Sequence, residues 1–155
     1  MTKINLTRVF LGGAVAGIFA ISIQYIAFFL GAYQRLSAVT GVNWHDFPVG
    51  THITIAAMEI LIGGPMAVWF YAAIRPRFGA GPRTAVIAGA YLWAVLCPYG
   101  LTVLTTLGLL AQIPLTLMIM LNAVALPFMV GAVLVGAKIY QEDTVSPPLA
   151  QATGK

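Results

Sequence analysis

Four long apolar stretches, separated by short segments that hold nearly all of the charged residues, dominate the chain. They cover residues 9–31, 52–74, 85–106 and 114–137. Each has about the 20 apolar residues that a helix needs to cross the hydrocarbon core of a bilayer. The pattern predicts an all-α membrane protein with four transmembrane helices and short loops. They form one domain over residues 1–143, and a polar C-terminal tail follows at 144–155.

The third and fourth stretches form one apolar run from Thr84 to Lys138, which is far too long for a single crossing of the bilayer. Gln112 and Pro114 mark the break. Proline is tolerated in the first turn of a helix, where its missing N–H costs no hydrogen bond. We therefore expect the fourth helix to begin at Pro114, after a short apolar hairpin.

The composition agrees with a membrane protein. Hydrophobic residues make up 60% of the 155 residues and charged residues 8%, and the mean hydropathy is +0.92. A soluble domain carries about a quarter charged residues. Although the formal net charge is +4, the basic residues flank apolar stretches, so we expect no nucleic-acid partner. The single cysteine, Cys97, allows no intramolecular disulfide and no CxxC motif.

The basic residues lie very unevenly on the two sides of the predicted membrane. One side holds only Arg35, and the other holds Lys3, Arg8, Arg75, Arg77, Arg83, Lys138 and Lys155. Cytoplasmic loops carry the excess of Lys and Arg. Both termini and the turn between the second and third spans are therefore expected to be cytoplasmic. The first span is too long for a cleaved signal peptide and is expected to be retained.

The cytoplasmic turn carries the most distinctive motif of the chain. Residues 69–89 read "WFYAAIRPRFGAGPRTAVIAG", and residues 4–17 read "INLTRVFLGGAVAG". These segments resemble an uncharacterised family of small four-span bacterial membrane proteins with an RPRFG-x-GP-basic turn and a basic–Gly–Gly start. The resemblance implies the topology and the bacterial origin, and it implies no activity. Arg75, Arg77 and Arg83 are expected to bind anionic lipid headgroups there.

Glu59 is the only acidic residue inside a predicted span. Ionisable groups in a bilayer are costly and often mark a functional site. His52 lies seven residues earlier, about two helical turns away on the same face. Two interpretations stay open: a proton or ion site at Glu59 and His52, or a structural hydrogen bond from Glu59 to another helix.

The two histidines also raise the question of a cofactor. His45 and Asp46 lie in the external loop, and His52 begins the second span. A metal site needs three or four ligands with defined geometry, and a haem between helices usually has two axial ligands deep in the spans. We therefore predict no metal and no cofactor. A haem or chlorophyll-type pigment on His52 or His45 stays open as an alternative to a plain interfacial loop.

Small residues are spaced for close helix packing. Three pairs lie four positions apart within the spans: Gly13 with Gly17, Ala85 with Gly89, and Ala132 with Gly136. Such pairs let helix backbones approach closely in lipid. Pro65, Pro98 and Pro127 interrupt spans and predict kinks.

No catalytic constellation or phosphate-binding loop is present in the sequence, so we expect a non-enzymatic protein. The first hypothesis is an accessory or structural subunit of a larger bacterial membrane complex, with respiratory or photosynthetic assemblies among the hosts. Its partners would be other integral membrane subunits or further copies of the chain, together with anionic lipids. The alternatives are a small transporter or ion-conducting oligomer using Glu59, and a haem- or pigment-binding protein using His52.

Overall fold

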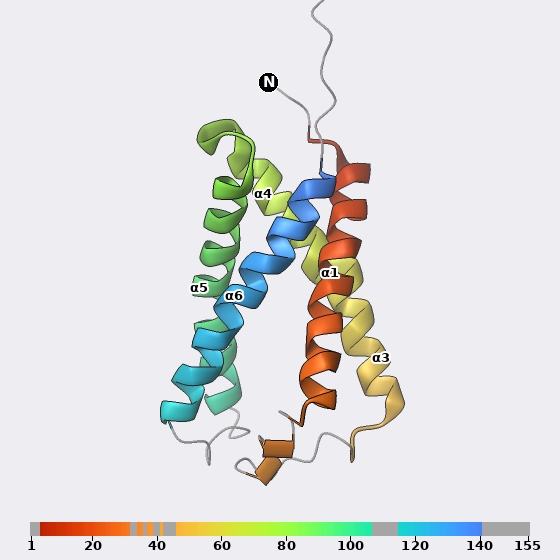
Figure 1. The fold of residues 1–155 in the computed structure, drawn as a ribbon, viewed down its shortest axis with the longest axis vertical. Helices are drawn as coiled ribbons and strands as arrows, with labels where there is room; N and C mark the ends of the chain where they lie inside the picture. The colour runs from red at the N-terminus through yellow and green to blue at the C-terminus, as the bar shows by residue number, and fades with distance from the viewer. Residues whose placement is uncertain are drawn as a thin grey trace, which may run out of the picture.

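The computed structural model describes residues 4–31, 34–35, 37–38, 41, 46–106 and 115–140. Its elements in chain order are α1 (Leu6–Phe29), α3 (Val49–Met58), the π-helix η2 (Glu59–Gly63), α4 (Gly64–Phe78), α5 (Pro82–Thr106) and α6 (Leu115–Ile139). No strand occurs among these described residues. The prediction of an all-α protein is therefore confirmed (Figure 1).

Three helical segments are long and apolar enough to cross a membrane: Leu6–Phe29, Val49–Phe78 and Met118–Ile139. The second segment consists of α3, η2 and α4 in one continuous run. Helix α5 covers the predicted third span and has 25 residues, which corresponds to about 37 Å. Helix α5 is not among these three segments. Its crossing of the membrane, and with it the total of four spans, therefore stays a prediction.

Local signals explain where the helices begin and end. The Asn5 side chain accepts a hydrogen bond of 3.0 Å from the backbone N–H of Arg8 and caps α1, which begins three residues before the expected position 9. Helix α4 ends at Phe78 and is followed by the capping residue Gly79, whose φ of +83° favours glycine. Pro82 then opens α5, as expected for a proline in the first turn.

The π-helix η2 marks an irregularity in the middle of the second segment. The Gly64 N–H bonds to the carbonyl of Glu59, one residue further back than in an α-helix. Pro65 follows directly, and a proline has no N–H and crowds the carbonyl four residues before it. We attribute the wider turn to Pro65, where the sequence predicted a kink.

The helix bundle has two ends, which we call the turn end and the loop end. The turn end lies at the α4–α5 turn, residues 79–81, and the loop end is the opposite one, where α1 leads into residues 30–48.

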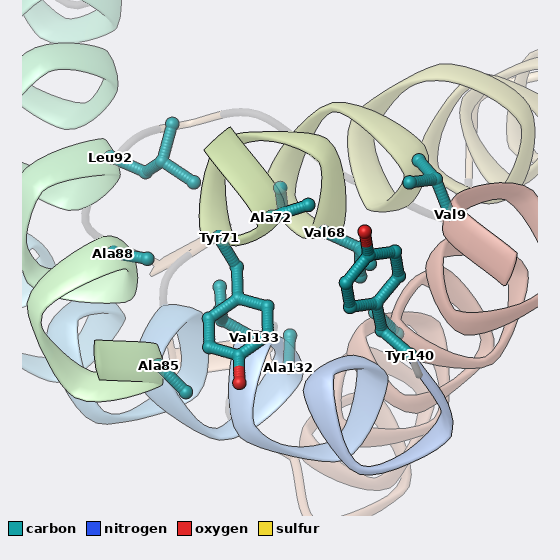
Figure 2. Close-up of a cluster of buried hydrophobic side chains, with 12 residues drawn as sticks. Val9, Val68, Tyr71, Ala72, Ala85, Ala88, Leu92, Ala132, Val133 and Tyr140 are labelled. Atoms are coloured by element: carbon teal, nitrogen blue, oxygen red, sulfur yellow. The ribbon is translucent and has the colours of Figure 1, made fainter. Parts of the chain in front are cut away.

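The buried apolar side chains form one cluster: Val9, Ala16, Ala67, Val68, Tyr71, Ala72, Ala85, Ala88, Leu92, Ala132, Val133 and Tyr140 (Figure 2). They lie in the halves of α1, α5, α6 and the continuous segment Val49–Phe78 that are nearer the turn end or, for Tyr140, directly after α6. Helices α3 and η2, toward the loop end, bury no residue.

Glycines on α1 allow the close packing at the turn end. A Cβ added at Gly13 would collide with the backbone of Pro65, and one added at Gly17 would lie 2.6 Å from the carbonyl oxygen of Glu59. On the next face, a Cβ at Gly12 would lie 2.7 Å from the carbonyl oxygen of Gly136. Helix α1 therefore touches the η2–α4 segment and α6 backbone to backbone.

The predicted pairs on α5 and α6 lie in the same packed half. Ala85 is fully buried and Ala132 is nearly so. A Cβ added at Gly89 would lie 2.7 Å from the Cα of Val130. Small residues therefore join α5 to α6 as well. Toward the loop end, α5 and α6 stay together and separate from α1 and α3 (Figure 1).

Candidate functional site

A hydrogen bond between two polar side chains joins α1 to η2 just beyond the packed core. The Gln24 Nε2 donates to Oε1 of Glu59 over 2.7 Å. Glu59 is half-buried, and its second oxygen, Oε2, is buried without a hydrogen-bond partner among the described residues. Buried polar atoms nearly always have a partner. One oxygen of this carboxyl is therefore held by the protein, and the other is buried with its hydrogen-bonding capacity unused among the described residues.

The local packing explains why these two residues meet. Gly17 permits α1 to touch the backbone of Glu59. Gln24 follows Gly17 by seven residues, about two helical turns, so it lies on the same face of α1. Its long side chain reaches the carboxyl at the start of η2, where the wider turn begins. The close contact and the hydrogen bond therefore belong to one helix crossing.

A cavity of about 830 Å³, here called the larger cavity, lies beside this pair. Core residues Ala16, Leu92 and Ala132 line it toward the turn end, and Arg35 lines it toward the loop end. Among the 20 lining residues that the structure describes, three carry polar side chains, namely Gln24, Arg35 and Glu59. The volume and the mostly apolar wall with a few polar groups are typical of small-molecule sites.

A second cavity of about 300 Å³, here called the smaller cavity, lies between α1 and α3. Three of its eight described lining residues are polar: Gln24, Tyr25 and His52. Gln24 also lines the larger cavity. This one side chain therefore borders both cavities and bonds to Glu59.

Comparison with protein-family models, curated proteins and solved structures finds no match to this chain. The chemistry of the site therefore has to be inferred from its own residues.

Of the two histidines, only His52 belongs to the described residues. His52 is half-buried and lines the smaller cavity, while Asp46 is exposed. His45 lies outside the described residues. The residues that the structure describes contain no group of three or more His, Cys, Asp or Glu side chains that could hold a metal ion.

The arginine turn is built as a compact structure of its own. The Thr84 hydroxyl is positioned to donate to the carbonyl oxygens of Gly79 (2.7 Å) and Phe78 (3.2 Å), and the Gly81 N–H donates to the Tyr71 hydroxyl over 3.2 Å. These contacts tie the turn to the ends of α4 and α5. The turn therefore has a structural explanation that involves no ligand.

The three arginines near this turn differ in their surroundings. The Arg75 guanidinium lies 5.7 Å from the centre of the Tyr140 ring and is half-buried. Arg77 and Arg83 are exposed. The expected role in binding lipid headgroups therefore suits Arg77 and Arg83 better than Arg75, which stacks on the protein.

Sequence reasoning identified Glu59 but missed two residues of the site. Gln24 lies within the first predicted span, and its pairing with Glu59 was not predicted. Arg35 was expected only to lie outside the membrane, and it lines the larger cavity. A mid-span glutamine and a mid-span glutamate were a usable signal, because two polar groups in apolar spans tend to pair.

Proposed function

We propose that this protein is a non-enzymatic membrane protein that binds a small, mostly apolar cation in the larger cavity, as a carrier of that cation. The observation that supports this most is the Glu59 carboxyl in an apolar wall, with Oε1 bonded to Gln24 and Oε2 buried without a partner among the described residues. Because Glu59 lines the larger cavity, its carboxyl would attract a cationic or hydrogen-bond-donating group of a ligand there. The proposal corresponds to the transporter hypothesis of the sequence analysis.

The charges around the cavity favour a cation over an anion. Arg35 is exposed to solvent, whereas Glu59 is half-buried. Electrostatic interactions are stronger in a low-dielectric interior than in water. The Glu59 carboxyl therefore determines which charge binds at depth, and Arg35 acts more weakly at the loop end. The apolar wall would contact the body of the ligand.

A pair of ions with the same shape and opposite charge tests this proposal. We expect the wild-type protein in nanodiscs to bind tetraphenylphosphonium at least about tenfold more tightly than tetraphenylborate, a difference of about 1.4 kcal/mol. Isothermal titration calorimetry measures both affinities, and the partitioning of each ion into empty nanodiscs is subtracted. Equal affinities, or tighter binding of tetraphenylborate, would contradict a cation site at Glu59.

We propose further that α5 is a fourth membrane span and that the protein lies in a bacterial inner membrane with both termini in the cytoplasm. The length of α5 supports the fourth span. The excess of basic residues at the turn end supports the orientation, because cytoplasmic loops carry more Lys and Arg. Arg77 and Arg83 would then face anionic lipid headgroups.

A role as an accessory subunit of a larger complex stays a hypothesis. Large apolar side chains such as Phe29, Leu61 and Tyr99 are exposed along the helices. Either a bilayer or a partner subunit would cover such side chains equally well. Their exposure therefore does not favour a partner subunit over lipid. The Glu59 site, in contrast, calls for a ligand of particular chemistry, and for this reason we place the carrier function first.

A further inference from the structure

We infer that water and protons reach the Glu59 carboxyl from the loop end through the smaller cavity, past His52 and Gln24, while an apolar ligand occupies the larger cavity. The inference extends the proposed function, since it adds a second route to the same carboxyl. It depends on one juxtaposition: Gln24 lines both cavities and donates its hydrogen bond to Glu59.

The polarity of the two walls assigns the two routes. Polar cavities hold ordered water, whereas apolar cavities stay dry or take up apolar molecules. The smaller cavity has polar side chains at Gln24, Tyr25 and His52, and its 300 Å³ corresponds to about ten water volumes. The larger cavity is apolar apart from Gln24, Glu59 and the exposed Arg35. Water is therefore favoured in the smaller cavity.

The position of His52 gives the route its direction. His52 lies in the first turn of α3, and Glu59 follows seven residues later, about 10 Å along the helix axis. The route therefore runs from the loop end toward the middle of the bundle. An imidazole can accept a proton on one ring nitrogen and release one from the other. His52 is thus suited to the outer part of a path for protons.

The polar and charged groups around Glu59 are few among the described residues. Gln24 from α1 contacts it, His52 stands on α3, and Arg35 lines the far end of the larger cavity. The charged residues of α4, Arg75 and Arg77, lie in its last turn at the turn end. No other described charged side chain lines either cavity.

Cysteine accessibility tests the inference without any ligand. The reporter is the Glu59→Cys variant in a Cys97→Ala background, treated with the anionic, water-soluble thiol reagent methanethiosulfonate ethylsulfonate, which does not belong to the cations proposed for the larger cavity. Two half-buried alanines serve as matched positions for blocking substitutions: Ala56 lines only the smaller cavity, and Ala125 lines only the larger one. Ala56→Phe is expected to slow the modification at least about tenfold and Ala125→Phe less than about twofold, because water is favoured in the smaller cavity.

The inference would be overturned if Ala125→Phe slowed the reaction as much as or more than Ala56→Phe, or if the reagent did not react. The Gln24→Cys variant is the second reporter in case Glu59→Cys does not fold, and circular dichroism verifies the folding of each protein. Tetraphenylphosphonium binding is measured separately on the wild type. If the wild type did not bind tetraphenylphosphonium while the cysteine variants showed the expected accessibility pattern, only the proposed function would be contradicted. If the wild type bound the cation but the accessibility pattern differed, only the route would be contradicted.

Discussion

Replacing Gly64 with alanine is expected to destabilise the folded protein by about 3 kcal/mol or more, the upper range for overpacking. The added Cβ would collide with the carbonyl of Gly13 and lie 2.9 Å from the backbone nitrogen of Gly17. Both neighbours are backbone atoms of α1, so no side chain can rotate away. The α1–α4 crossing would have to open, and the buried cluster at the turn end would lose its packing.

The neighbouring residue provides the control for this prediction. A Cβ added at Gly63 meets only the carbonyl oxygen of Met58, at 3.9 Å, which is an ordinary contact. Gly63→Ala is therefore expected to change the stability by less than about 1 kcal/mol, in line with the helix propensities of the two residues. Unfolding in mixed micelles by increasing amounts of dodecyl sulfate, followed by tryptophan fluorescence, compares the two variants. Equal stabilities would show that the helices do not cross as described.

Replacing Glu59 with glutamine is expected to weaken tetraphenylphosphonium binding at least about tenfold, or about 1.4 kcal/mol. Glutamine keeps the size of the side chain and its oxygen acceptor for Gln24, but it removes the charge next to the ligand. The protein should therefore stay folded while its affinity for the cation falls. Calorimetry in nanodiscs measures the affinity, and circular dichroism verifies the helix content.

The matched control is Asp46→Asn, which removes the same charge from an exposed position that lines neither cavity. We expect this variant to bind the cation as the wild type does. If both variants lost affinity equally, the effect would come from the net charge of the protein and not from the site. Unchanged binding by Glu59→Gln would contradict the role of the carboxyl.

Much of the fold could be predicted from the sequence because the bilayer imposes strong requirements. A span needs about 20 apolar residues, and such stretches are visible without any knowledge of contacts. The start of α1 at Leu6 was harder to predict from the sequence, since it depends on the cap by Asn5. The π-helix was not foreseen, although Pro65 predicted an irregularity, because proline can be accommodated by a kink or by a wider turn.

The candidate site could be predicted only in part. Glu59 was identified because a carboxyl in a span is costly and therefore conspicuous. Its partner Gln24 lies 35 residues away in the chain, and their contact depends on how closely α1 approaches at Gly17. The cavities were not predictable, because they arise where the helices diverge beyond the small residues of the turn end. Residue spacing along one helix contains no information about such a divergence.

The carboxyl carbon of Glu59 offers the most direct test of the central claim, that this group binds a cation in the larger cavity. The chain contains only two glutamates, Glu59 and Glu142, so selective ¹³C labelling of glutamate Cδ produces two signals that the Glu142→Gln variant assigns. We predict that tetraphenylphosphonium moves the Glu59 signal in solid-state NMR spectra and leaves that of Glu142 in place, and that tetraphenylborate moves neither. A Glu59 signal that does not move at saturating tetraphenylphosphonium would contradict the account.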